Sequence, residues 1–265
     1  MKVRRFLIPV HVFVAFALFS SAAYAQTPNI TVNINGTVIG PSPSPLTIPP
    51  GPYGVLTISS YLGKPPQVVT SDESASGTTD SLTLKYATIS TTATGTFSIT
   101  FESSNFVAPP SSSPGNPVWY YALASGSFGR PGPAQLAIGD SITLTGKVDR
   151  QHTGAWDTIQ SPVTKIVCGM AGCNTFSANT FKTLKEPYDI TSPRGLRGEI
   201  SFTLNNAIDR LNISEVTVKQ GDPPGRGGDK VCEVEACTDF TNRSEEGFLC
   251  RVLNICGPCV IEDTN

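Results

Sequence analysis

Five of the chain's seven cysteines lie close together near its C-terminal end, and closely spaced thiols can carry several kinds of chemistry. They are Cys232, Cys237, Cys250, Cys256 and Cys259, separated by four, twelve, five and two residues. The other two, Cys168 and Cys173, lie upstream and flank four residues. Such thiols can exchange electrons as a dithiol, hold a metal as thiolates, or form disulfide bonds. The surrounding elements and the compartment decide among the three.

The string Cys256-Gly-Pro-Cys259 resembles the active site of the thioredoxin family. The resemblance implies a thiol oxidoreductase whose first cysteine stands at the start of a helix that follows a strand. Only six residues follow Cys259, and no βαβ pattern surrounds the motif, so the context argues against redox catalysis. Two close pairs, Cys232 with Cys237 and Cys256 with Cys259, also have the composition of a four-thiolate zinc site.

The first 25 residues have the pattern of a secretory signal peptide. A basic start precedes an apolar run from Phe6 to Phe19, and Ala23-Tyr24-Ala25 places small residues at the cleavage positions. The apolar run is shorter than the roughly 20 residues that a helix needs to cross a bilayer. We therefore expect cleavage after Ala25 and a secreted or periplasmic protein whose mature chain has no membrane span.

Export favours disulfides among the three thiol chemistries, because oxidising compartments join neighbouring thiols. Residues 231–265 would bury too little apolar surface to fold alone, and cross-links offset that deficit. We expect a Cys168–Cys173 bond, disulfides within a C-terminal module, and one odd cysteine that is free or links two chains. Neither a metal nor another cofactor is predicted. Apolar residues at helical spacing from Glu245 to Asn254 predict that this module is partly helical.

A linker separates the C-terminal module from the rest of the chain. Residues 221–230 contain two prolines and four glycines, which cannot continue a strand or helix. The chain has 19 basic and 21 acidic side chains; three of the basic ones belong to the leader, which leaves 16. The whole acidic excess lies from Asp222 onward. Nucleic acid is therefore not an expected partner, since it is bound by clustered positive charge.

Residues 26–220 are predicted to form an all-β domain. Runs rich in Thr, Val, Ile, Phe and Tyr recur between Gly and Pro turn signals, and several alternate, as Phe97, Ile99 and Phe101 do. The only hint of a helix is a turn or two around Asn205 to Leu211. The expected strands are Ile30–Ile39, Gly54–Ser60, Ser81–Ser90, Gly95–Phe101, Val118–Phe128, Ser141–Val148, Val163–Val167, Glu199–Leu204 and Ile213–Val218. This pattern predicts an antiparallel β-sandwich, Ig-like or jelly-roll-like, with elaborated loops.

Two short blocks suggest a hydrolase. Gly139-Asp-Ser141 resembles the block that opens the GDSL-type esterases, and Asp149-x-x-His152 resembles their second block. The resemblance implies Ser141 as nucleophile, His152 as its base and Asp149 as the acid that orients it. In that family the two blocks lie far apart in an α/β fold, whereas here they nearly touch and Ser141 opens a strand-like run. We interpret His152 instead as an exposed residue of a polar hairpin loop.

Aromatic side chains indicate where a ligand binds. Trp119 and Tyr121 share one face of a predicted strand and are assigned to the core, whereas Tyr120 on the other face and Trp156 in a loop are the expected ligand contacts. We therefore predict an exported, non-catalytic β-sandwich that binds a cell-surface, glycan or protein partner or has a structural role. The alternative is a secreted enzyme, either a hydrolase that uses Ser141 and His152 or a thiol oxidoreductase that uses Cys256 and Cys259.

Overall fold

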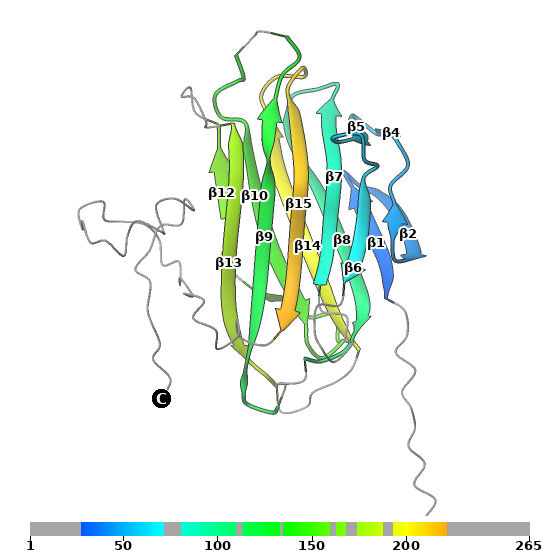
Figure 1. Ribbon diagram of the computed structural model, residues 1–265, viewed down its shortest axis with the longest axis vertical. Helices are drawn as coiled ribbons and strands as arrows, with labels where there is room; N and C mark the ends of the chain where they lie inside the picture. The colour runs from blue at the N-terminus through cyan, green and yellow to red at the C-terminus, as the bar shows by residue number, and fades with distance from the viewer. Residues whose placement is uncertain are drawn as a thin grey trace, which may run out of the picture.

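Two antiparallel sheets packed face to face form the body of the protein, as the computed structural model shows (Figure 1). It describes residues 28–71, 81–109, 113–132, 135–159, 163–167, 174–187 and 193–221. These ranges contain no helix, and therefore no helix that is long and apolar enough to cross a bilayer. The described part of the chain is therefore an all-β antiparallel two-sheet sandwich, as the alternating runs predict.

The first sheet has the order β11-β10-β14-β8-β1-β2, with β12 paired to β10. Its strands are β1 (Asn29–Ile34), β2 (Thr37–Pro43), β8 (Gly95–Phe106), β10 (Ser141–Asp149), β11 (Asp157–Thr158), β12 (Val163–Ile166) and β14 (Arg194–Leu204). The second sheet has the order β13-β9-β15-β7-β5-β4, and β6 joins β3 to β7. Its strands are β3 (Leu46–Thr47), β4 (Gly51–Tyr53), β5 (Leu56–Ser60), β6 (Gln67–Ser71), β7 (Ser81–Thr91), β9 (Pro117–Gly129), β13 (Thr175–Lys185) and β15 (Arg210–Gly221).

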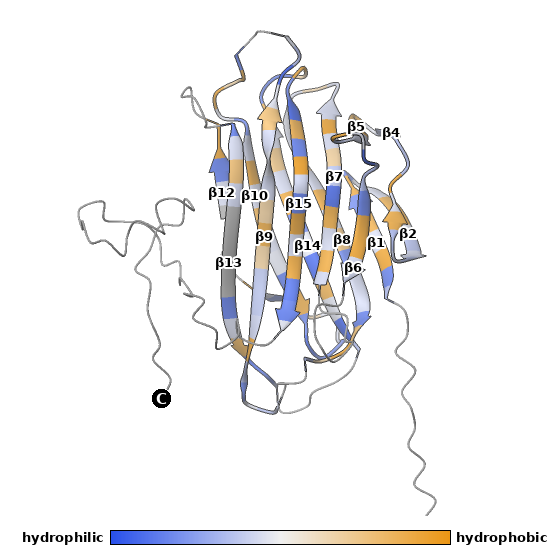
Figure 2. Ribbon diagram, in the orientation of Figure 1, coloured by the Kyte–Doolittle hydropathy of each residue, from blue (hydrophilic) through white to orange (hydrophobic). Residues whose placement is uncertain are grey.

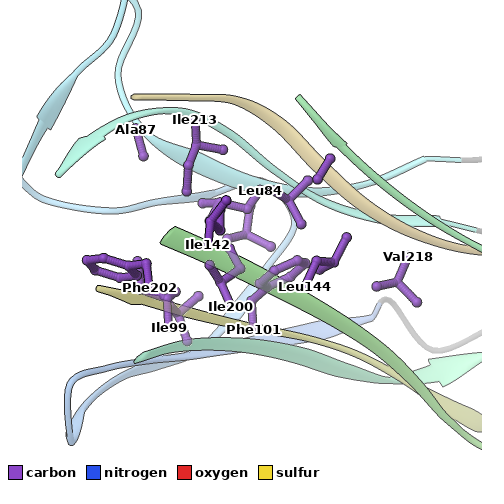
Figure 3. Close-up of a cluster of buried hydrophobic side chains, with 14 of the residues drawn as sticks. Leu84, Ala87, Ile99, Phe101, Ile142, Leu144, Ile200, Phe202, Ile213 and Val218 are labelled. Atoms are coloured by element: carbon purple, nitrogen blue, oxygen red, sulfur yellow. The ribbon is translucent and has the colours of Figure 1, made fainter. Parts of the chain in front are cut away.

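A single hydrophobic cluster fills the space between the sheets. Phe101, Ile142 and Phe202 reach into it from the first sheet, and Leu84 and Ile213 reach into it from the second (Figure 3). Each is at most 3% exposed. Polar and apolar residues alternate along strands such as β15 (Figure 2), so that one face of each sheet packs inward while the other faces solvent.

The predicted strand from Ile30 to Ile39 is wrong, because the chain reverses in its middle. Asn35 and Gly36 have φ angles of 46° and 90°, and β1 and β2 pair on either side of them, Ile34 opposite Thr37. Asn-Gly favours this turn, since its central residues need positive φ. The segment is thus a hairpin on the first sheet, and Asn29 and Thr31 of β1 lie beside β8.

Five strands were not predicted, namely β3, β4, β6, β11 and β13, and one helical hint is wrong. β6 has only five residues, and β13 is rich in threonine, serine, asparagine and lysine, so neither segment shows a clear apolar alternation in the sequence. β13 lies at the edge of the second sheet beside β9, and an edge strand can contain more polar residues than a central one. The helix hint fell on Asn205 to Leu211. Asn205 to Ile208 instead form a turn between β14 and β15, and β15 begins at Arg210.

Several predictions concern residues outside the described ranges. They include the signal peptide of residues 1–25, nearly all of the linker, the module of residues 231–265 and all seven cysteines. The disulfide framework, the partly helical tail and the domain boundaries therefore remain predictions.

Candidate functional site

An open depression of about 470 Å³ lies on the outer face of the first sheet, at the end where β10 finishes. We call it the Trp156 depression. It is lined by Asn29, Thr31, Glu102, Ser103, Ser104, Asp149, His152, Thr153, Gly154, Trp156, Gly195 and Arg197. These residues come from four strands and from the loop between β10 and β11, and the sheet brings them together.

Strand register explains how residues far apart in sequence form the floor. Arg197 on β14 pairs with Lys147 on one side and with Glu102 on the other, and Glu102 pairs with Thr31 on β1. All four belong to the polar set of their strands, so they form one row across the solvent face. The floor of the depression is thus polar and rests on paired strands.

Trp156 forms the aromatic part of the site. It precedes β11, and its ring lies over Gly195 of β14: a Cβ atom built at Gly195 would stand 2.7 Å from Cη2 of the ring. The Arg197 guanidinium lies over the ring, 4.0 Å from the centroid, which is a cation–π contact. Trp156 remains half-buried. The missing side chain at Gly195 therefore makes room for the ring, and Arg197 holds it in place.

The loop that carries Trp156 is shaped by Asp149. This carboxylate is 4% exposed and accepts hydrogen bonds from the backbone amides of Gln151 (3.3 Å), Thr153 (3.1 Å) and Gly154 (2.7 Å). His152 lies in the same loop, exposed and with a φ of 52°. β10 pairs with β11 across the loop, so the interpretation of residues 149–157 as a polar hairpin is confirmed. Asp149 orders backbone rather than a histidine ring.

The charges of the floor are paired with one another. The Arg197 guanidinium donates to Oε2 of Glu102 from Nε at 2.7 Å and from Nη2 at 2.5 Å. Glu199, the next outward residue of β14, accepts from Lys147 at 2.8 Å and lies 3.7 Å from Nη1 of Arg197. Because each positive side chain has a carboxylate partner, the site presents no uncompensated positive charge.

The prediction that Tyr120 contacts a ligand at the surface is wrong. Tyr120 is completely buried, and its hydroxyl donates to Oε1 of Glu186 at 2.9 Å and accepts from Nη1 of Arg194 at 3.0 Å. Burial raises the pKa of this phenol. The faces of β9 are reversed relative to the prediction, since Trp119 and Tyr121 point outward and are half-buried. Tyr120 therefore joins the two sheets beneath the site.

The hydrolase assignment of Ser141 and His152 is also wrong. Ser141 is the first residue of β10 and His152 lies beyond its last, Asp149. Eight steps of about 3.3 Å along a strand separate the two ends by roughly 26 Å, far beyond hydrogen-bonding reach. The thiols of the oxidoreductase alternative, Cys256 and Cys259, lie outside the described residues. Within the described ranges, no three His, Cys, Asp or Glu side chains gather as metal ligands.

Trp156 is the one predicted contact that the structure places in the depression; that it binds a ligand stays a prediction. Glu102, Arg197, Gly195 and Thr31 were not singled out from the sequence. Their spacing along the chain carries no signal, because only the pairing of β14 with β8 and of β8 with β1 brings them together. Alternation along each strand could have placed them on the solvent face but not side by side.

No family model matches the chain, and no curated protein matches it. Among solved structures it is similar to TmCBM61 in complex with beta-1,4-galactotriose, at 11% identity and a TM-score of 0.26, over 62% of this chain and 88% of that one. It is also similar to CBM28, a carbohydrate-binding module specific for non-crystalline cellulose, at 11% identity and a TM-score of 0.25, over 63% and 82%. At these TM-scores the likeness supports no conclusion about function.

Proposed function

We propose that the chain is an exported, non-catalytic protein that binds a glycan in the Trp156 depression. The observation that carries the proposal is a half-buried indole ring at the edge of a concave floor of hydroxyl, amide and charged groups. A sugar presents both an apolar C–H face and a rim of hydroxyls. An aromatic wall beside fixed polar groups suits both parts of such a ligand.

A small glycan fits this site better than a protein partner does. The depression holds about 470 Å³, which is the size of a small-ligand site. A stable protein interface needs about 800 Å² on each partner. The polar floor and its paired charges offer directed hydrogen bonds rather than a broad apolar contact.

Binding is favoured over hydrolysis because both carboxylates of the depression are already used. Glu102 accepts from Arg197, and Asp149 accepts from three backbone amides. A glycosidase needs one carboxyl group that gives a proton to the leaving group and a second that acts as base or nucleophile. Asp149 uses both oxygens to hold the loop, and the Arg197 guanidinium on Glu102 favours its ionised form, so neither carboxyl group is suited to give a proton to a leaving group.

Screening the purified protein on an array of neutral and acidic glycans, followed by calorimetry with the best ligand, tests the proposal. Trp156→Ala is expected to weaken binding at least about tenfold, which equals about 1.4 kcal/mol. Trp119→Ala is the matched control, because Trp119 is also half-buried but lies on the outer face of the second sheet. Unchanged affinity in Trp156→Ala, with the fold intact by thermal melting, would place the glycan elsewhere.

A further inference from the structure

The end of the sandwich opposite the Trp156 depression carries several exposed apolar side chains. This is the end where β9 finishes and β10 begins, the upper end in Figure 1. Ile138, Ile166 and Ile208 are 73%, 56% and 50% exposed. They are three of the five strongly exposed large hydrophobic residues in the described ranges. We call this surface the isoleucine end.

Hydrogen bonds join the three segments that carry these isoleucines. The side-chain amide of Asn205 donates to the carbonyl of Ile138 at 3.3 Å. The backbone amide of Gly139 donates to the carbonyl of Val167 at 3.1 Å, next to Ile166. The Ala137 amide donates to Asp209, next to Ile208, at 3.3 Å. The exposed isoleucines therefore stand on hydrogen-bonded segments of one end of the sandwich: Ile138 and Ile208 on loops, and Ile166 at the end of β12.

The charged side chains that reach the surface of the isoleucine end, in the described stretches, are basic. In the described stretches 135–141, 163–167 and 203–210 the only acidic residues are Asp140 and Asp209, and both are completely buried. Asp209 is also paired with Arg130, whose Nη2 donates to it at 2.7 Å. Lys165 is half-buried and Arg210 is exposed. The surface thus combines apolar side chains with positive charge and exposes no acid in these stretches.

We propose that the isoleucine end docks on a lipid surface that contains anionic headgroups. Exposed isoleucines at one end of a sandwich can enter the boundary between headgroups and acyl chains, while neighbouring Lys and Arg are attracted to the negative surface. Three separated isoleucines fall well short of the area that a stable protein interface buries, which disfavours a protein partner. In this orientation the Trp156 depression, at the far end of β10, faces away from the membrane.

Co-sedimentation of the expected exported chain, which begins at Gln26 and lacks the apolar leader, with vesicles tests this docking. Binding to phosphatidylcholine vesicles with about 30% phosphatidylglycerol is expected to be at least tenfold tighter than to phosphatidylcholine alone. It should also weaken as salt rises from about 0.05 M to about 0.5 M. The double variant Ile138→Ser/Ile208→Ser should bind the anionic vesicles at least tenfold more weakly, and Arg210→Gln about fivefold more weakly.

Leu62→Ser is the matched control, because Leu62 is 75% exposed but belongs to the turn after β5. It should bind vesicles like the unchanged protein, as should Trp156→Ala, which separates this test from the glycan experiment. Thermal melting checks that each variant is folded. Absence of binding to anionic vesicles overturns the proposal, and so does equal binding by the double variant. Capture of a protein by the unchanged chain, without vesicle binding, would assign the surface to a protein partner instead.

Discussion

Replacing Asp140 with asparagine is expected to remove a pH-dependent loss of stability. Asp140 and Asp209 are both completely buried where β10 and β15 begin. Oδ1 of Asp140 accepts from the backbone amide of Asn205 at 2.7 Å, whereas Oδ2 has no hydrogen-bond partner. Burial, together with the neighbouring Asp209, raises the pKa of Asp140 from 3.8 to about 6. Burial opposes ionisation of Asp209 as well, but hydrogen bonds from Arg130 and Ala137 keep the pKa of that carboxyl below its usual value.

The direction in which pH changes the free energy of unfolding depends on whether the folded or the unfolded chain binds the Asp140 proton more tightly. The folded state holds the Asp140 proton more strongly than the unfolded chain does. Protonated Asp140 therefore contributes fully to stability below about pH 4, and this stabilisation is lost as pH rises through about 6. Two pKa units correspond to about 3 kcal/mol, and screening by solvent reduces the expected loss to on the order of 2 kcal/mol. Asparagine keeps the oxygen that accepts from Asn205 and does not ionise.

Urea unfolding of both proteins at about pH 4.5, 5.5 and 7 measures the effect. The unchanged protein should lose on the order of 2 kcal/mol over this range, whereas Asp140→Asn should stay nearly level and be the more stable at pH 7. Asp157→Asn is the control, because that side chain is 49% exposed in its ion pair with Arg150. An equal slope in Asp140→Asn and the unchanged protein would refute the buried-carboxyl reasoning.

Three further predictions concern the site, the core and the thiols. Gly195→Val should displace the Trp156 ring, because the added Cβ would lie 2.7 Å from Cη2 of the ring, and should weaken glycan binding at least about tenfold by calorimetry. Arg194→Met should cost about 3–5 kcal/mol of unfolding free energy in urea, because it leaves Glu186 buried without its 2.5 Å partner. Intact mass after alkylation in denaturant should show three disulfides and one thiol; seven alkylated thiols without reductant would contradict the disulfide framework.

The fold class could be predicted because alternation is a local property. Phe97, Ile99 and Phe101 alternate with polar residues and are all buried. The Asn35-Gly36 dipeptide is also a local turn signal. The turn was not predicted because β-forming residues on both sides of it read as one continuous strand. β13 was missed since an edge strand can carry polar residues on both faces.

The candidate site was only partly predictable. The loop position of Trp156 follows from the polar, glycine-containing string around it, and this places the ring at the surface. Its partners Gly195 and Arg197 come from a strand about 40 residues later, and only sheet register sets them under the ring. The face assignment of β9 failed because Trp119, Tyr120 and Tyr121 are consecutive aromatic residues, so hydrophobicity alone could not decide which of them pack inward.

The fluorescence of Trp156 itself tests the central claim most directly. The chain has two tryptophans, so Trp119→Phe leaves Trp156 as the sole indole reporter. Titration of this variant with the best array glycan should shift or quench the emission, with a midpoint equal to the calorimetric Kd. A glycan that binds with that Kd while the Trp156 emission stays constant in wavelength and intensity would contradict binding in the depression.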